Sequence, residues 1–279
     1  MKQLLLALFM ISLMMMACEN NGQDKEAKAE KRLQIEMQTT AGTMLIALYN
    51  ETPKHRDNFL KLAEEGAFDS LLFHRVIADF MIQGGDPDSK YASPGDTLGN
   101  GGLPYRVDAE FSPELYHKKG ALGAARDGNM ARASSPMQFY MVQGKVFNDS
   151  LLLKAEERIQ GWMAVNAARN DSANQALSQA LEQAMEVGDM ESYQRYNDSL
   201  KKIGMAEKSF VPYQIPEAQR AVYKSLGGTP HLDQNYTVFG EVIEGIAVID
   251  LIAAVPTDAM DRPLTDVRIL SVKVLPVSD

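Results

Sequence analysis

Apolar and polar residues begin to alternate at residue 33, after an apolar run and a charged stretch at the N-terminus. Leu33 to Gln38 alternates strictly, and Thr43 to Tyr49 supplies a second apolar run after a turn that contains glycine. Alternation with period two predicts strands buried on one face, so we expect a β-hairpin here. Thr52 as the N-cap and Pro53 in the first turn then predict the start of a short helix, which Gly66 would end.

Residues 73 to 86 read Phe-His-Arg-Val-Ile-Ala-Asp-Phe-Met-Ile-Gln-Gly-Gly-Asp. The first half is typical of a β-strand, and the glycine pair is a stop signal. Arg75 is the unusual residue, because a strand has no need of an arginine among large apolar side chains. The pattern leaves two interpretations open: Arg75 is a solvated strand residue, or it is a cation held beside an apolar surface.

A long helical stretch separates two blocks of β-type sequence. Residues 148–204 contain no proline, and their apolar residues recur at three- and four-residue steps, which predicts amphipathic helices. Asn148-Asp149-Ser150 would cap the first helix, and Gly188-Asp189 marks a turn. This stretch is far longer than an ordinary connection, so we interpret it as a helical hairpin inserted into a mainly β fold. The remaining predicted strands lie on the two sides of this stretch, at Gly120 to Ala125, Gln138 to Val142, Tyr236 to Gly240 and Asp266 to Leu275.

The N-terminus carries an apolar run from Leu4 to Ala17 that only Ser12 interrupts. A membrane-spanning helix needs about 20 apolar residues, so this run fits the core of a signal peptide. Ala17 directly precedes Cys18, the only cysteine of the chain, and the pair resembles a bacterial lipobox. That resemblance implies cleavage before Cys18 and lipid attachment to it; the alternative is an ordinary signal peptide with an incidental cysteine. We therefore expect a signal peptide at 1–17, a polar and flexible tether at 18–32, and a lipid-anchored protein of the bacterial cell envelope, facing the periplasm or the cell surface.

Composition narrows the function classes. The chain is 45% hydrophobic, as in ordinary globular proteins, and its net charge of −9 argues against non-specific binding of nucleic acid. No two of the four histidines have metal-ligand spacing, and we predict no metal site and no cofactor. Asp86 and Asp88 are interpreted as a solvated loop rather than as a cation site.

Several blocks together resemble one family. The stretch 73–86 is similar to the signature of cyclophilin-type peptidyl-prolyl isomerases, and three later blocks follow in the expected order: Gln138-Phe139-Tyr140, Leu232-Asp233 and Val238-Phe239-Gly240. The resemblance implies a closed antiparallel β-barrel of eight strands capped by two helices. We expect this barrel to be discontinuous, at 33–143 and 231–279, with the helical insertion at 144–230.

The resemblance also implies a chemistry, namely rotation about X–Pro peptide bonds. The planar amide resists rotation with a barrier of about 18–20 kcal/mol, and in the twisted transition state the nitrogen lone pair becomes a better hydrogen-bond acceptor. A charged group with fixed N–H donors stabilises that state more than either planar form, and arginine provides such a group. By resemblance, Arg75 is the catalytic residue, and Gln83 orients it or contacts the substrate backbone.

The remaining site residues are also implied by the resemblance. The proline pocket would consist of Phe80, Met81, Tyr140, Leu232 and Tyr236, with His231 beside it, while Ala125, Arg126 and Gln138 would line the groove for the preceding residues. Gln138 could equally be a structural hydrogen-bond partner, and Phe139 is expected in the barrel core because it alternates with Tyr140. The sequence departs from the family at four places, with Tyr140 for phenylalanine, His231 for tryptophan, Tyr236 for histidine and Arg126 for asparagine. None of these departures removes Arg75.

The sequence thus predicts an exported prolyl isomerase that assists the folding of envelope or secreted proteins, with proline-containing segments of client proteins as its partners. The alternative is a non-catalytic peptide- or protein-binding module, with the helical insertion as its interface for a protein partner. A third possibility is a holdase chaperone that acts through the insertion.

Overall fold

The computed structural model describes residues 31–276 of the 279-residue chain. The predicted signal peptide, the predicted lipidation site at Cys18 and all but the last two residues of the predicted tether lie outside the described residues. Within residues 31–276, none of the helices combines the length and the apolar character that crossing a membrane requires.

Eight strands form a single antiparallel sheet in the order β3-β4-β6-β5-β7-β2-β1-β8. The predicted hairpin is confirmed, because β1 pairs with β2 over six consecutive positions. The strands are β1 Gln34–Thr39, β2 Gly42–Leu48, β3 Phe73–Ile77, β4 Met81–Gly84, β5 Ala121–Ala124, β6 Phe139–Val142, β7 Val238–Glu244 and β8 Ile269–Val274.

The sheet is curled, but the prediction of a closed barrel is not confirmed. β3 and β8 stand at the two ends of the strand order. Leu72 and Arg268, which precede them, form an isolated antiparallel bridge, and the Phe73 amide donates to the carbonyl of Val267 at 2.9 Å. The two edges therefore meet over a short stretch only, and the part of the chain that the structure describes has no continuous ladder between them.

One apolar core fills the concave side of the sheet, and two helices contribute to it. The alternation of β1 is reproduced, since Ile35 and Met37 are fully buried. Phe59 of α2 (Pro53–Glu64) stacks on Phe68 with ring centroids 4.5 Å apart, and α7 (Ala247–Ala253) buries Ile249 in the same core. α2 and α7 thus correspond to the two expected capping helices.

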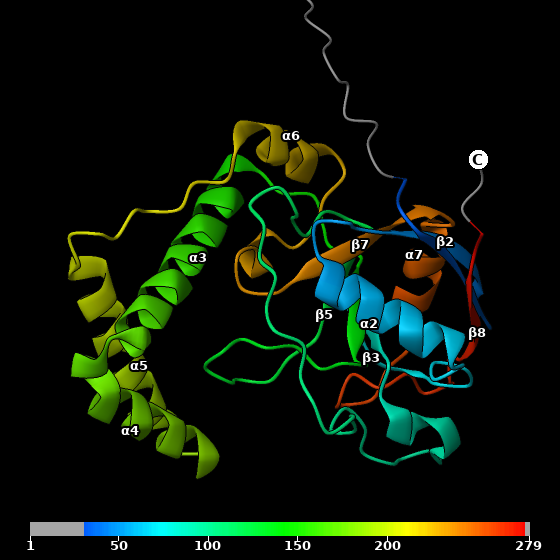
Figure 1. Cartoon of the computed structure of the whole chain (residues 1–279), viewed down its shortest axis with the longest axis horizontal. Coiled ribbons are helices and arrows are strands. Elements are labelled where there is room, and N and C mark those ends of the chain that lie inside the picture. Colours follow the sequence, from blue (N-terminus) through cyan, green and yellow to red (C-terminus); the bar gives the residue numbers. More distant parts are fainter. Residues whose placement is uncertain (1–30, 277–279) are drawn as a thin grey trace, which may run out of the picture. The chain divides into compact units, whose positions relative to one another are not determined.

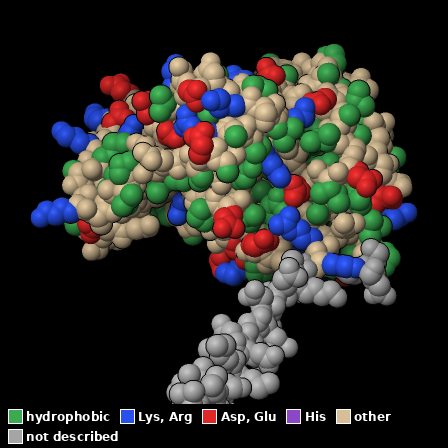
Figure 2. All heavy atoms as spheres, turned by 90° about the horizontal axis from the view of Figure 1, so that it is seen from above, with side chains coloured by type: hydrophobic (Ala, Val, Ile, Leu, Met, Phe, Trp, Pro, Cys, Tyr) green, Lys and Arg blue, Asp and Glu red, His purple; other side chains and the backbone are tan. Residues whose placement is uncertain are grey.

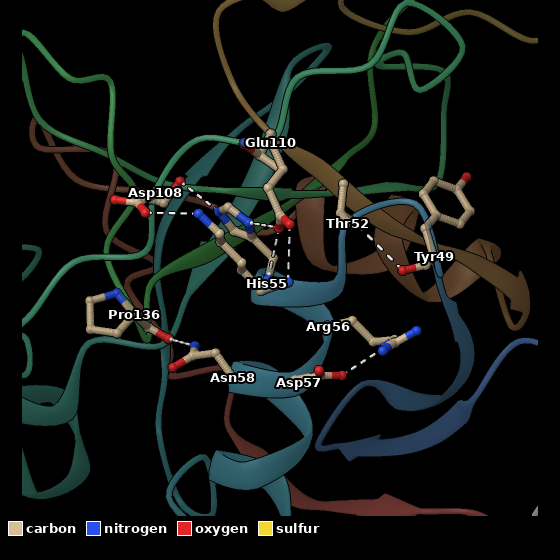
Figure 3. A network of polar contacts seen from close by, with 12 residues as sticks. Tyr49, Thr52, His55, Arg56, Asp57, Asn58, Asp108, Glu110 and Pro136 are labelled. Atoms are coloured by element: carbon tan, nitrogen blue, oxygen red, sulfur yellow. Dashed lines mark hydrogen bonds and ion pairs between the residues drawn. The ribbon is translucent and has the colours of Figure 1, made fainter.

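The N-terminus of α2 is capped differently from the prediction. The helix follows Thr52 as expected, but the Thr52 hydroxyl donates to the carbonyl of Tyr49 at 3.4 Å and makes no capping bond. Instead the Glu110 carboxylate accepts from the backbone amides of Lys54 and His55 at 3.1 and 3.0 Å (Figure 3). A negative charge at this position is favourable because the helix dipole is positive there. The prediction failed because the capping group lies far away in the sequence.

The helical segment, residues 144–230, lies between β6 and β7, and its long helices group together in Figure 1. The Asn148 side chain caps the first helix by accepting from the Leu151 amide at 2.9 Å, as predicted, and the expected turn at Gly188-Asp189 separates the next two. That the segment is an insertion into the β fold stays a prediction. Its helices are α3 Asp149–Asn170, the short 3₁₀ turn η2 Ser172–Asn174, α4 Gln175–Glu186, α5 Met190–Ala206 and α6 Glu217–Ser225.

α3 and α5 cross closely, and their contact holds the helical hairpin together. At Gly204 an added Cβ would lie 2.0 Å from the Ala164 carbonyl oxygen, so only glycine permits this approach. Leu181 of α4 and Leu200 of α5 are buried in the same cluster as Ala168 of α3. Part of the predicted apolar stripes therefore forms the inner faces of the hairpin.

Candidate active site

A cavity of about 290 Å³ opens beside β3, β4 and β6, and nine of the predicted site residues line it. Five more lining residues come from β3 and from two loops that the sequence reasoning did not assign to the site. The predicted residues are Arg75, Phe80, Met81, Gln83, Ala125, Arg126, Tyr140, Leu232 and Tyr236, and the additional ones are His74, Leu98, Gly99, Asn100 and Met260.

The sheet register explains why these side chains meet. Arg75 of β3 pairs with Gln83 of β4, Gln83 pairs with Tyr140 of β6, and Tyr140 pairs with Gly123 of β5. Residues in one row across a sheet present their side chains on the same face. At Gly123 an added Cβ would lie 2.3 Å from the Tyr140 ring, so glycine leaves the space that this ring occupies.

Phe139 and Tyr140 point in opposite directions, as their alternation predicted. Phe139 is buried in the main core against Phe59 and Phe68. Tyr140 belongs to a second apolar cluster on the other face, together with Met81. Phe80, Leu232 and Tyr236 also pack on this second cluster, which forms the wall of the cavity.

Arg75 is held at the mouth of the cavity by an ion pair. Its side chain is 43% exposed, and its Nε atom lies 3.4 Å from a carboxylate oxygen of Asp261. The loop that carries Asp261 is fixed to β3, since the Asp261 carbonyl accepts from the Val76 amide at 2.8 Å. Both interpretations of Arg75 thus hold in part, because it is half solvated and is also held beside an apolar surface. The sequence reasoning missed Asp261, for which no local pattern exists.

Gln138 connects Gln83 to the neighbouring loop. The Gln83 amide donates to the Gln138 side-chain oxygen at 3.0 Å, and the Gln138 amide donates to the carbonyls of Gly99 and Gly101 at 2.9 and 2.8 Å. Gln138 lines an adjoining cavity rather than the cavity at Arg75. Of the two interpretations left open, these contacts favour the structural hydrogen-bond partner.

A buried polar network explains the tyrosine at position 140. The His117 ring lies between the Tyr140 hydroxyl, at 2.9 Å from Nε2, and the Asp233 carboxylate, at 2.7 Å from Nδ1. The Tyr223 hydroxyl donates to the second Asp233 oxygen at 2.7 Å. Burial raises the pKa of Tyr140 well above its ordinary value, so the phenol keeps its proton at neutral pH. The Tyr140 ring is therefore positioned through a chain of groups that reaches α6.

His231 does not line the cavity at Arg75. Its ring stacks on Phe80 with centroids 5.6 Å apart, and it faces a separate cavity next to α3. Burial lowers the pKa of His231 to about 4, so the ring is neutral at pH 7. His231 thus packs against Phe80 of the pocket wall, and its predicted part in substrate binding stays a prediction.

His74 lines the cavity but has the properties of a packed residue. It is buried, and burial is the main cause that lowers its pKa to about 4. Asp86 is also fully buried and accepts from the Gly99 amide, so it holds the loop at the rim of the cavity. The prediction of a solvated loop is therefore wrong for Asp86. Among residues 31–276, no three side chains of the histidine, cysteine, aspartate and glutamate types gather as a metal site would need.

The protein thus combines a curled antiparallel sheet with an apolar pocket on the outer face of the sheet, and an arginine lies at the mouth of this pocket. This combination defines the class of protein. The family model described as "Cyclophilin type peptidyl-prolyl cis-trans isomerase/CLD" matches residues 34–274. The chain therefore belongs to the cyclophilin-type peptidyl-prolyl cis-trans isomerase family, as its motifs predicted.

Curated relatives carry corresponding names. A protein of Staphylococcus haemolyticus named "Putative peptidyl-prolyl cis-trans isomerase" is 30% identical over 246 residues, which cover 88% of this chain and 92% of that protein. A protein of Streptococcus pyogenes named "Putative bifunctional phosphatase/peptidyl-prolyl cis-trans isomerase" is 31% identical over 243 residues. The match covers 86% of this chain but only 38% of that longer relative.

A solved structure supports the fold. A crystal structure of a Cryptosporidium parvum cyclophilin-type peptidyl-prolyl cis-trans isomerase aligns with a TM-score of 0.51 at 18% identity, over 89% of this chain and 100% of the other. At this identity the likeness shows a shared fold.

Proposed function

We propose that this protein catalyses cis–trans isomerisation of X–Pro peptide bonds in client proteins, with Arg75 as the catalytic residue. The observation that carries the proposal is the row of Arg75, Gln83 and Tyr140 across three strands, which places a guanidinium beside an apolar pocket. Family membership supports the same reaction.

The pocket holds the proline ring, and Arg75 stabilises the transition state. Phe80, Met81 and Leu232 offer an apolar surface of the kind that a proline ring needs. Held there, the ring stays still while the residue before it rotates. The Arg75 N–H groups then meet the nitrogen lone pair that appears only midway through rotation. Since no bond is made or broken, this reaction needs neither a nucleophile nor a general base.

The required stabilisation is modest. Lowering a barrier of about 20 kcal/mol by about 6 kcal/mol accelerates the reaction about 10⁴-fold. Arg75 is half exposed when the groove is empty, and a bound peptide would cover it and strengthen its interaction in the lower dielectric. A desolvated charged hydrogen bond and the positioning of the substrate can together account for a barrier reduction of this size.

The test of the proposed activity is a direct measurement of prolyl isomerisation. Exchange between the cis and trans forms of a short proline peptide is followed by NMR, without a coupled protease, in the presence and absence of the protein. The proposal predicts an exchange rate that rises in proportion to protein concentration. An exchange rate equal to that of the peptide alone would refute it.

We further propose that the protein is exported and lipid-anchored through Cys18, and that it assists the folding of envelope or secreted proteins. The apolar run before a lone cysteine supports this proposal. Mass spectrometry of the mature protein from a bacterial membrane fraction should find Cys18 as a modified N-terminal residue. A Cys18→Ser variant should lose the modification; membrane attachment of that variant by the same fraction as wild type would contradict the proposal.

A binding role of the helical segment is a second candidate, because its turn between α4 and α5 exposes apolar side chains. Val187 and Met190 are 70% and 66% exposed there. A holdase acting through this turn should lose its suppression of client aggregation when Val187→Asp and Met190→Lys are combined, while peptide isomerisation persists. Unchanged suppression would eliminate this candidate.

A further inference from the structure

A second cavity of about 220 Å³ adjoins the proline pocket, and the helical segment forms one of its walls. Arg126 and Tyr236 line both cavities and form the boundary between them. On the helical side, Trp162 of α3 packs against Tyr236 with ring centroids 6.4 Å apart. The helical segment thus extends the groove.

The second cavity carries an excess of positive charge. Its charged lining residues are Arg126, Arg132, Arg169 and Glu182. Arg169 is neutralised, because it pairs with Glu182 at 2.7 Å. Arg126 and Arg132 have no carboxylate at ion-pair distance among the described residues, which leaves two uncompensated guanidinium groups. The chain as a whole has a net charge of −9, and acidic and basic side chains are interspersed over the face in Figure 2, so this local excess is unusual for the protein.

Both uncompensated arginines are held in place by neutral groups. Arg126 donates to the backbone carbonyls of Asn235 and Asp127 at 3.0 and 2.8 Å, and its guanidinium lies 4.5 Å from the centre of the Tyr236 ring. Arg132 donates to the Gln234 carbonyl at 3.1 Å. Arg132 also lies over an aromatic ring, with its guanidinium 4.4 Å from the centre of Phe111.

These contacts leave further N–H donors on each guanidinium, which has five in a fixed plane. The two groups lie near each other, because they donate to the carbonyls of the adjacent residues Asn235 and Gln234. Burial and then the charge of Arg126 lower the pKa of Arg132, as expected for two neighbouring cations, which repel each other. An anion between them would relieve this repulsion and accept charge-assisted hydrogen bonds. The geometry therefore favours a carboxylate as the occupant.

We propose that the second cavity binds an acidic side chain of the client peptide, at the residue directly before the proline. This inference rests on the proposed function, because it assumes that a proline occupies the pocket at Arg75. Arg126 lines both the proline pocket and the second cavity, and consecutive Cα atoms are about 3.8 Å apart, so a residue next to the bound proline would lie within reach of Arg126. The substrates would be X–Pro segments in which X is glutamate or aspartate; Arg126 and Arg132 would supply the specificity, and the helical segment would form the opposite wall of the cavity.

The chain provides its own reporter for a binding test. Trp162 is the only tryptophan of the protein and lines the second cavity, so its fluorescence responds to occupancy. Blocked peptides Ala-Glu-Pro-Phe, Ala-Gln-Pro-Phe and Ala-Lys-Pro-Phe are titrated into the wild-type protein at low and at high ionic strength. We expect the glutamate peptide to bind about five- to tenfold more tightly than the glutamine peptide, with a smaller difference at high salt. Equal affinities for these two peptides at low salt would overturn the inference.

Substitutions of single arginines test whether the second cavity causes the preference for the glutamate peptide. Arg132→Gln should bring the ratio of the two affinities close to one, whereas Arg132→Lys should retain part of the preference because it keeps the charge. Arg195→Gln on α5 is the matched control and should leave the ratio unchanged, since Arg195 lies outside both cavities. A preference that survives in Arg132→Gln, with the fold verified by circular dichroism, would contradict the assignment.

The fluorescence test needs no catalysis, so the two proposals fail separately. Isomerisation of the glutamine peptide without any preference for glutamate would leave the proposed function intact and refute this inference. Preferential binding of the glutamate peptide without isomerisation would support the cavity as a recognition site and refute the proposed enzymatic activity.

Discussion

The hydroxyl group of Tyr140 offers a sharp test of the buried network beneath the pocket. Tyr140→Phe removes this hydroxyl and keeps the ring, which lies nearly parallel to His117 with centroids 6.0 Å apart. Packing is therefore preserved, and the main change is the loss of the bond to Nε2 of His117, an atom in a fully buried residue. Leaving one buried acceptor unpaired costs about 1–3 kcal/mol.

This cost is measured as the free energy of unfolding in urea. We expect Tyr140→Phe to lose about 1–3 kcal/mol with an unchanged m-value. Tyr236→Phe is the matched control, because it removes a hydroxyl from the same pocket that makes no hydrogen bond with the described residues. We expect its stability to remain within about 0.5 kcal/mol of wild type.

A double-mutant cycle tests whether the network acts as a unit. Tyr223 binds the other oxygen of the same Asp233 carboxylate that holds His117. The effects of Tyr140→Phe and Tyr223→Phe should therefore be non-additive, with a coupling energy of at least about 0.5 kcal/mol. Stability of Tyr140→Phe equal to that of wild type would refute the reasoning, because the family's more familiar phenylalanine would then fit this pocket equally well.

Three further predictions follow from the site. Asp261→Asn should lower kcat by about three- to tenfold with little change in KM, because the substitution frees Arg75 without touching the pocket; equal kcat values would show that the ion pair does not position Arg75. Gly123→Ala should raise KM, because its Cβ would lie 2.3 Å from the Tyr140 ring, and an unchanged KM would contradict this packing. Burial lowers the pKa values of His74 and His231 from about 6.5 to about 4, so the unfolded chain takes up protons between these values and the folded protein does not. The contribution of these two residues to the free energy of unfolding is thus complete above about pH 6.5 and is lost as the pH falls toward 4. Urea unfolding at pH 7.5, 5.5 and 4.5 measures this loss, and His231→Gln should make the free energy of unfolding depend less on pH.

Features set by neighbouring residues could be predicted from the sequence. The β1–β2 hairpin follows from alternation, and the start of α3 follows from the Asn148 side chain that caps it. The opposite directions of Phe139 and Tyr140 follow from the period of a strand. The signature around Arg75 carried the family assignment, because many specified positions fall within one short window.

Features set by distant residues could not be predicted in this way. Glu110 caps α2, and Asp261 holds Arg75, yet neither has a local pattern that marks it. The position of the helical segment also depends on tertiary contacts, such as the packing of Trp162 on Tyr236. Only the fold shows that this segment forms a second cavity opposite Arg126 and Arg132 of the barrel.

The central claim is that Arg75 stabilises the twisted prolyl amide, and the most direct test is kcat/KM for Arg75→Ala on a proline peptide. The account predicts a loss of at least about 100-fold relative to wild type, partly restored by added guanidinium ion. Arg195→Ala should retain full activity and controls for the loss of an arginine elsewhere on the surface. Wild-type kcat/KM in Arg75→Ala would contradict the account.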